Sequence, residues 1–348
     1  MDIVKIFIPT TVAFIIGILI TPIISNFLYK NKMWKKKSVV ASTDGGLTTI
    51  TQKLHNDEER KTPRMGGVVI WASALITVLL FWLGSIIDGP ILEKLNFLSR
   101  NQTWLPIFTL IVGALVGLID DYFSVTERYD QKAGGLSSKK RLLAVFIISL
   151  IGAWWFYSKL EVTEIIIPFW GVWDAGLIFI LFFIIVTLAT YSGGVIDGLD
   201  GLSGGVFAII FGAYGLIAFL QNQIDLAAFC FVLVGGILAF LWFNIPPARF
   251  FMSETGTMSL TITLVVIAFL TKQVLILPII AFPLVISSAS SQIQLLSKRF
   301  RNGKKVFLVA PLHHHFQALG WPATKVVMRY WILGIVFAGI GIIIALVG

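Results

Sequence analysis

Five carboxylates lie at the ends of three apolar segments that otherwise carry little charge. They are Asp120 and Asp121 in LPIFTLIVGALVGLIDDYF, Asp197 and Asp200 in GGVIDGLDGLSGG, and Glu254 in FNIPPARFFMSETGTMSL. A single aspartate at a helix end is ordinarily a cap or a solvated charge, but ionisable groups at a membrane boundary are costly unless they are paired or functional. Gathered like charges repel unless a cation neutralises them. Oxygen donors without thiolates favour Mg²⁺ or Mn²⁺, and Mg²⁺ commonly bridges to a substrate phosphate. The group therefore predicts a metal–phosphate site.

Glycines surround two of these carboxylates. They are Gly193, Gly194, Gly198, Gly201, Gly204 and Gly205. Glycine lets backbone N–H groups approach a phosphate closely, and a helix beginning near Ser203 would add its positive N-terminal dipole. Tight helix packing is the alternative, because small residues also line helix interfaces in membranes. The flanking aspartate pair favours phosphate binding.

Three of the four histidines form one run, His313, His314 and His315, within APLHHHFQALGWPATK. The run follows the basic stretch KRFRNGKK at 298–305. An imidazole there can donate to a phosphate or accept a proton near neutral pH. Adjacent histidines fit poorly around zinc, whose ligands are spaced to surround it, and a plain polar loop is the other alternative. We expect phosphate chemistry, with at most one or two of the three rings facing one site.

The chain has 348 residues, 57% hydrophobic and 13% charged, whereas a soluble domain would be about 25% charged. Recurring apolar runs of about 18 residues predict an all-α, polytopic integral membrane protein with about ten transmembrane helices in one domain, residues 1–348. Each run must be helical because lipid offers the backbone no hydrogen-bond partners. The first run is too long for a signal peptide and reads as a span. The predicted spans are 3–29, 66–87, 104–120, 142–158, 176–192, 204–221, 227–244, 257–271, 274–297 and 328–347.

Lysine and arginine are distributed unevenly between the two ends of these spans. The segments 30–64, 122–141, 245–256 and 298–329 contain 22 of the 27, so the positive-inside rule places them in the cytoplasm and both termini outside. The carboxylates and histidines then share the cytoplasmic face of the plasma membrane. The net charge of +9 indicates anionic lipid or an anionic substrate rather than nucleic acid. The single cysteine, Cys230, excludes a disulfide framework and a cysteine-based metal site.

Five motifs occur in an order that resembles a known family. They are TPRMGG (62–67), GLIDDYF (117–123), IDGLDGLSGG (196–205), FN followed by PA and FM (243–252), and PLHHHFQALGWPATKVVMRYWI (311–332). Over essentially its whole length the chain resembles the polyprenyl-phosphate N-acetylhexosamine-1-phosphate transferases, which have ten spans. The histidine–GWP segment resembles the peptidoglycan branch. The resemblance implies transfer of phospho-MurNAc-pentapeptide from UDP-MurNAc-pentapeptide to undecaprenyl phosphate, giving lipid I and UMP, with Mg²⁺ as cofactor. It also implies a homodimer, because family members commonly dimerise.

The resemblance also implies roles for particular residues. Asp120 would be the base that activates the lipid phosphate, Asp121 its partner near the metal and diphosphate, and His313 a diphosphate contact or proton-transfer group. The residues expected to contact substrate are Asp197, Asp200, Asn244, Phe251, His314 and His315, with Phe251 facing the uracil. The residues expected to bind the metal are Asp121, Asp197 and Glu254.

The chain departs from the family pattern at four positions. Glu254 replaces an aspartate, Gly194 an asparagine, and Glu59 and Arg141 each a lysine. Three alternatives stay open beside the first interpretation. One is the sister branch, which transfers GlcNAc-1-phosphate, although the histidine–GWP segment argues against it. Another is a lipid transporter, which would place its ionisable groups at midplane in symmetric halves. The third is a non-catalytic homologue that serves as a scaffold.

Overall fold

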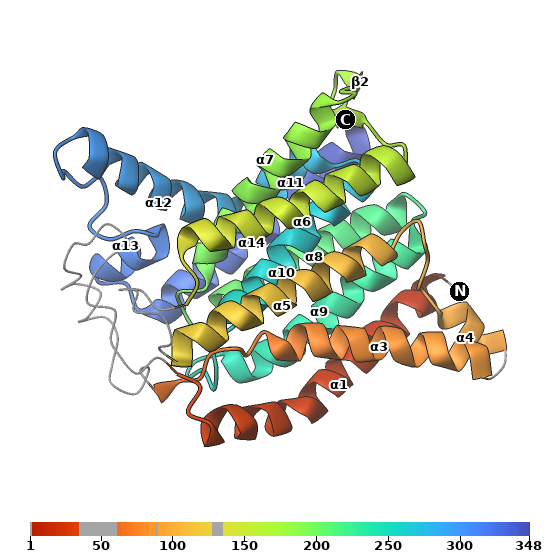
Figure 1. Cartoon of the computed structure of the whole chain (residues 1–348), viewed down its shortest axis with the longest axis horizontal. Coiled ribbons are helices and arrows are strands. Elements are labelled where there is room, and N and C mark those ends of the chain that lie inside the picture. The colour runs from red at the N-terminus through yellow and green to blue at the C-terminus, as the bar shows by residue number, and fades with distance from the viewer. Residues whose placement is uncertain (1, 35–60, 88–89, 127–134) are drawn as a thin grey trace.

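The computed structural model describes residues 2–34, 61–87, 90–126 and 135–348, and within them the chain is a bundle of long helices (Figure 1). Nine of the described helices are long and apolar enough to cross a membrane, which confirms the predicted all-α, multi-span class. They are α1 (Asp2–Lys30), α3 (Val68–Ile87), α5 (Trp104–Thr126), α6 (Ser138–Lys159), α7 (Ile178–Ser192) with the 3₁₀ turn that continues it to Ile196, α8 (Leu202–Leu220), α9 (Ile224–Asn244), α10 (Ser253–Leu270) and α14 (Ala323–Val347). The short helices α4 (Pro90–Leu95) and α13 (Leu312–Ala318) lie between them in the chain.

Helix α10 occupies the middle of the bundle and contacts α3, α5, α7 and α8. In its most apolar window 89% of the residues are buried, compared with 22% in α1 and in α14. Three of its hydroxyls are satisfied within the helix, because Thr257, Ser259 and Thr261 each donate to the carbonyl one turn earlier. The central helix can therefore carry these polar side chains in an apolar core with their hydrogen bonds made.

The predicted span 274–297 is not one straight helix. A 3₁₀ turn (Val274–Ile276) and α11 (Leu277–Ile280) run into α12 (Phe282–Phe300) with an 82° bend. Pro283 lies at the start of α12, and a proline cannot donate the backbone hydrogen bond that would continue the preceding helix. Counting the bent pair as one span brings the total in the described residues to ten.

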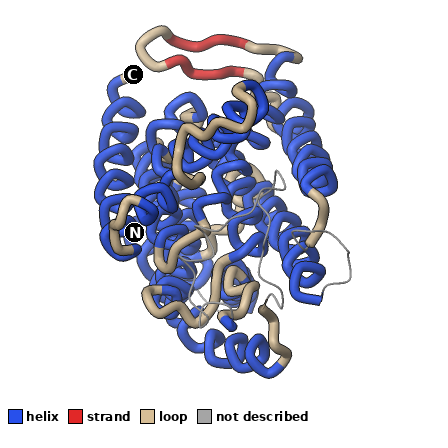
Figure 2. The backbone as a smooth tube through the Cα atoms, turned by 90° about the vertical axis from the view of Figure 1, so that its left-hand side faces the viewer, coloured by secondary structure: helices blue, strands red, loops and turns tan. Residues whose placement is uncertain are grey.

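A β-hairpin interrupts the helical pattern between α6 and α7 (red in Figure 2). Strands β1 (Glu164–Ile167) and β2 (Gly171–Asp174) pair antiparallel, with Ile165 opposite Trp173. The prediction of an all-α protein has only a connection here, between the spans 142–158 and 176–192. A four-residue strand with an apolar sequence such as EIII resembles the end of a neighbouring membrane span. Hydrophobic periodicity therefore does not distinguish such a strand from the span.

The chain termini and the predicted carboxylates lie at opposite ends of the bundle. Lys5 pairs with Asp225 at the start of α9, and the Phe169 N–H in the hairpin turn donates to the Gly348 carbonyl at 3.3 Å. Both termini are therefore at the hairpin end, toward the right of Figure 1. The predicted separation of the termini from the carboxylates is found in the structure. The assignment of that end to the outside stays a prediction.

Candidate active site

Two of the predicted aspartates cap the beginning of α10. Asp121 is fully buried and accepts hydrogen bonds from the Thr255 N–H at 2.9 Å and the Thr255 hydroxyl at 2.8 Å. Asp197 accepts from the Ser253 N–H at 2.7 Å. The first N–H groups of a helix lack intrahelical partners and carry partial positive charge. The helix end therefore holds carboxylates that come from two separate elements, α5 and the loop before α8.

Helices α5 and α10 approach each other closely at this point because α5 has a glycine there. A Cβ on Gly117 would lie 2.3 Å from the Glu254 carbonyl oxygen, so any larger residue would push the two helices apart. Asp120 and Asp121 follow within one turn of Gly117. Close packing thus brings the aspartate pair of α5 to the carboxylate-bearing end of α10.

A guanidinium group lies between two further carboxylates, those of Asp120 and Glu254. Arg141 Nη1, from α6, is 2.7 Å from Glu254 Oε1 and 3.8 Å from Asp120 Oδ2. The other Asp120 oxygen, Oδ1, accepts from the Leu136 N–H at 2.6 Å. The Tyr191 hydroxyl lies 3.5 Å from Glu254 Oε2. The arrangement is two carboxylates held around one cation.

Arg64 provides a second cation beside the same cluster. Its Nε donates to Asp121 Oδ1 at 3.2 Å. It belongs to the TPRMGG motif, which lies against the loop before α10 because the Gly66 N–H donates to the Phe251 carbonyl at 2.8 Å and the Phe251 N–H to the Pro63 carbonyl at 2.9 Å. The motif supports the family resemblance, but no role for Arg64 was predicted from it. The signal in the sequence is a cation that directly follows a proline and lies two residues before a pair of glycines.

The loop that carries Asp197 and Asp200 is held by hydrogen bonds to two neighbouring segments. Asp197 accepts from the Ser203 hydroxyl at 2.7 Å, and Asp200 accepts from the Ala248 N–H at 3.0 Å. Burial raises the pKa of Asp197, although the hydrogen bonds from Ser203 and the Ser253 amide partly offset that rise. Both oxygens of Asp197 are engaged by protein donors in this arrangement.

Asn244 joins this loop to the segment before α10. Its Oδ1 accepts from the Gly201 N–H at 3.0 Å and its Nδ2 donates to the Phe250 carbonyl at 2.8 Å, while the side chain is 1% exposed. Gly201 has φ +78°, a conformation that glycine adopts without strain. The structure shows a positioning role for Asn244. Its predicted contact with substrate stays a prediction.

Two histidines of the predicted run reach the aspartate loop. A Cβ on Gly198, between Asp197 and Asp200, would lie 2.4 Å from His313 Nε2 and 2.8 Å from His314 Nε2, so only glycine admits both rings. His314 Nδ1 is 2.8 Å from Gln317 Oε1. The third ring, of His315, accepts from the Leu308 N–H at 3.2 Å. This matches the expectation that at most two of the three would face one site.

The His313 ring is fully buried, and within the described part of the chain neither of its nitrogens has a hydrogen-bond partner. Burial, with His314 beside it, holds the pKa of His313 well below its usual range. The ring is therefore neutral at physiological pH. A buried polar group without a partner is costly, which indicates that a ligand or water completes its bonding.

Some of the glycines around the aspartate loop serve packing. A Cβ on Gly205 would lie 2.0 Å from Trp331 Nε1, which also donates to the Gly201 carbonyl at 3.2 Å. Gly194 faces α10, where an added Cβ would lie 3.3 Å from the Thr257 Cβ. Helix packing, the alternative weighed for these glycines, therefore accounts for Gly205 and for the small residue at position 194. Glu59, the remaining departure from the family pattern, lies outside the described residues.

Within the described residues, no three His, Cys, Asp or Glu side chains are grouped to hold a metal. Mg²⁺ is usually bound by one or two carboxylates together with substrate phosphates. Glu254 fits that requirement, because its carboxylate offers hard oxygen donors beside a position now taken by a cationic nitrogen. The predicted metal ligands Asp121, Asp197 and Glu254 stay predictions.

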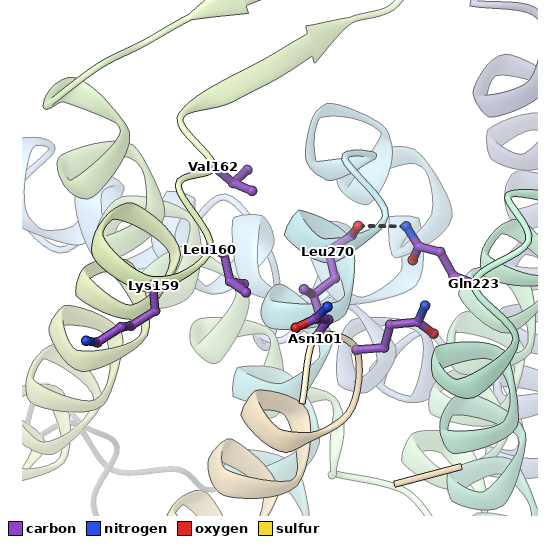
Figure 3. A pocket seen from close by; sticks show the side chains of 7 residues that line it. Asn101, Lys159, Leu160, Val162, Gln223 and Leu270 are labelled. Carbon is purple, nitrogen blue, oxygen red and sulfur yellow. Dashed lines mark hydrogen bonds between the residues drawn. The ribbon is translucent and has the colours of Figure 1, made fainter. Parts of the chain in front are cut away.

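A cavity of about 460 Å³ lies at the opposite end of the molecule (Figure 3). Its walls include Asn101, Lys159, Gln223 and Leu270, and the Gln223 side chain donates to the Leu270 carbonyl at 3.1 Å. None of its lining residues is a carboxylate or a histidine. The cavity is therefore separate from the carboxylate cluster.

The middle of the chain, residues 103–272, matches the family model described as Glycosyl transferase family 4. That range contains all five predicted carboxylates and ends before the histidine run. The site built from α5, the aspartate loop and the start of α10 is thus the part of the chain that the family model describes.

Three relatives that match nearly the whole chain share one name. The chain is 35% identical over 338 residues to the phospho-N-acetylmuramoyl-pentapeptide-transferase of Listeria monocytogenes, with 96% of each chain covered. It is 35% identical over 336 residues to the protein of that name from Anoxybacillus flavithermus, with 95% of each covered. A Bacillus anthracis protein of that name is 35% identical over 337 residues, covering 96% of this chain and 95% of the relative. The chain therefore belongs to the phospho-N-acetylmuramoyl-pentapeptide-transferase family.

Proposed function

We propose that the protein transfers phospho-MurNAc-pentapeptide from UDP-MurNAc-pentapeptide to undecaprenyl phosphate, giving lipid I and UMP in peptidoglycan synthesis. The relatives' shared name supports the donor. One structural observation supports the chemistry: Asp120 and Glu254 are held around the Arg141 guanidinium at one end of a membrane-spanning bundle. Carboxylates and cations at that depth can meet a lipid phosphate, whose prenyl chain stays in the bilayer.

Asp120 is the proposed base for the lipid phosphate. Its Oδ1 is fixed by the Leu136 N–H, whereas within the described residues Oδ2 contacts only Arg141, at 3.8 Å. That oxygen is the one best placed to accept a proton. A deprotonated phosphate oxygen then attacks the phosphorus bonded to the sugar, and UMP leaves with the electron pair of the broken P–O bond.

The neighbouring residues would position the phosphates and offset their charge. Phosphoryl transfer depends mainly on positioning and on electrostatic stabilisation of the transition state. Arg64 and Arg141 bring two positive charges to the cluster. His313, neutral and buried with unpaired ring nitrogens, can donate one hydrogen bond to a diphosphate oxygen. Asp200, Phe251 and His314 remain the proposed contacts for the nucleotide and sugar.

Mg²⁺ is the proposed cofactor. Glu254 would hold it, with Asp121 and Asp197 as the further predicted ligands. When bound, Mg²⁺ would supply charge neutralisation at the diphosphate of the donor. The support is the oxygen-only donor set together with a carboxylate pair that already accommodates a cation.

The protein is proposed to reside in the plasma membrane with the carboxylate end in the cytoplasm. The described parts of the basic segments lie at that end, and both termini lie at the other. A homodimer is also proposed, on the family resemblance alone.

The test is UMP release by detergent-purified protein given undecaprenyl phosphate, Mg²⁺ and UDP-MurNAc-pentapeptide, with UDP-GlcNAc in parallel and EDTA as the metal-removal arm. We expect release with the muramyl donor alone, and its loss in EDTA. Release only with UDP-GlcNAc would assign the chain to the sister branch. No UMP release with either donor, from protein that elutes as a folded species in gel filtration, would favour the non-catalytic homologue.

A further inference from the structure

The turn of the β1–β2 hairpin exposes large apolar side chains. Trp170 is 88% exposed and Phe169 is 67% exposed, and Val172 and Trp173 beside them are 63% and 45% exposed. An exposed cluster of large apolar side chains, unlike a scattered single one, usually marks an interaction surface. The hairpin also lies at the end of the bundle opposite the carboxylate cluster, because it connects the end of α6 to the start of α7.

Several contacts at its base hold the hairpin in place. Ile165 is 2% exposed and belongs to the core. The Thr163 hydroxyl donates to Asp174 at 2.6 Å, and Lys272 pairs with Glu164 at 2.7 Å. At the other end of the hairpin, the turn is tied to Gly348, the residue that follows α14, through the Phe169 N–H. Charged groups therefore lie at the base and aromatic rings at the turn, in a fixed arrangement.

The exposed apolar surface continues from the hairpin onto a membrane-spanning helix. Leu177 is 70% exposed, and Ile178 and Leu181 in α7 are each 58% exposed. Between Ile165 and Leu181 the only charged residue is Asp174, whose carboxylate is engaged by Thr163 and by the Gly176 N–H. The exposed face of α7 must contact lipid, and the hairpin extends that face past the end of the helix. Continuity favours lipid over a second protein as the occupant.

We propose that the hairpin is an interfacial anchor, with Phe169 and Trp170 seated in the head-group region of the leaflet opposite the carboxylate cluster. Tryptophan and other aromatic rings favour this region because their apolar faces and polar edges suit a boundary between lipid and water. The anchor sets the depth of the α6–α7 connection. Through the hydrogen bond to Gly348 it also fixes the end of α14.

The test measures the depth of a spin label at Val172→Cys, which leaves both aromatic rings of the turn in place. The background is Cys230→Ala, since Cys230 is the only cysteine and is buried. In vesicles of phosphatidylethanolamine and phosphatidylglycerol, collision rates with oxygen and with a water-soluble nickel chelate report depth. Arg100→Cys is the aqueous control at the same end of the molecule, and Leu181→Cys is the lipid-facing control. We expect the label at 172 to be shielded from nickel severalfold relative to that at 100.

A second variant separates anchoring from mere proximity. Phe169→Ser with Trp170→Ser, in the label-172 protein, should raise nickel access severalfold toward the value at Arg100→Cys, while the gel-filtration profile stays unchanged because both rings are exposed. Nickel access at 172 equal to that at 100 in the parent would overturn the proposal. So would unchanged access in the double variant. Dipolar broadening between labels at 172 would instead assign the surface to a second copy of the chain.

Discussion

Asp120 differs from its neighbours because one of its oxygens is left with a single long contact. Asp120→Asn keeps the acceptor for the Leu136 N–H and removes the charge that would take a proton. General acid–base catalysis typically contributes about 10²–10⁴-fold, so UMP release should fall at least about 10²-fold with no change in unfolding temperature. Asp174→Asn, the same change in the distant hairpin, should leave turnover intact. Wild-type turnover in Asp120→Asn would remove this residue from the chemistry.

The side chain of Glu254 is long enough to reach Arg141, and a shorter carboxylate would not make the same contact. Glu254→Asp withdraws the carboxylate by about one bond length from a 2.7 Å contact, so the pair weakens without a net change of charge. Glu254→Gln keeps the length and removes the charge. We expect both to slow transfer, and Glu254→Gln to raise the Mg²⁺ concentration required for half-maximal rate by more. A Mg²⁺ titration of UMP release checks this. An unchanged titration in Glu254→Gln would contradict a metal role.

His313 should make stability depend on pH. Burial holds its pKa below the usual value, so the unfolded chain binds the proton first, near pH 6.5. The folded state is therefore fully favoured above that pH, and this contribution is lost as the pH falls below it. His313→Gln should flatten the decline between about pH 7 and pH 5, by up to about 1.4 kcal/mol per pH unit. If the free energy of unfolding falls with pH by the same amount in the wild-type protein and in His313→Gln, the His313 ring is not buried and neutral in the folded state.

At the level of residues, the sequence predicts which side chains take part in the site, and it says less about which residues contact them. The five carboxylates and the histidine run were recognisable from their types and positions. Arg64 and Tyr191 were not, because their contacts with Asp121 and Glu254 cross 57 and 63 residues of chain. Arg141 was noticed only as a departure from the family pattern. Its place between two carboxylates depends on three helices meeting.

At the level of elements, the contact between α5 and α10 depends on Gly117. Gly117→Ala would drive a Cβ to 2.3 Å from the Glu254 carbonyl oxygen. Overpacking of this kind costs about 1–3 kcal/mol and should move Asp120 away from Glu254, lowering both stability and turnover. Gly212→Ala in α8 is the matched control, because nothing lies within 4 Å of its Cβ position. Unfolding temperature and UMP release for both variants check the prediction. If Gly117→Ala and Gly212→Ala have equal unfolding temperatures and equal UMP release, the contact between α5 and α10 is not tightly packed at Gly117.

The long apolar helices were predictable from the sequence, but the bend between α11 and α12 and the β-hairpin were not. The bend between α11 and α12 follows from a proline just inside α12, yet a window average over 274–297 remains high enough to read as a span. The hairpin pairs strands of four residues each, shorter than the window that detects periodicity. In both cases the physical cause is local backbone chemistry.

For the whole molecule, the testable quantity is which end faces the cytoplasm. In the Cys230→Ala background, a membrane-impermeant maleimide should label Arg100→Cys in intact cells. It should label Lys304→Cys only in inverted vesicles, because that basic stretch belongs to the carboxylate end. Both positions are exposed, so reactivity reports sidedness rather than burial. The reverse pattern would overturn the proposed orientation and place the chemistry outside. Composition and charge asymmetry suffice to predict this arrangement, since they reflect the bilayer rather than side-chain contacts.

The burial of α10 also bears on how the protein can evolve. A helix whose neighbours enclose it on nearly every side tolerates few replacements, whereas α1 and α14, most of whose residues are not buried, accept varied apolar residues at their exposed positions. Substitutions should therefore accumulate in α1 and α14, while the sequence of α10 changes little. A lineage that replaced an acid at the first turn of α10 must have altered its partners in step, and variation there would record changes in chemistry rather than in the surrounding membrane.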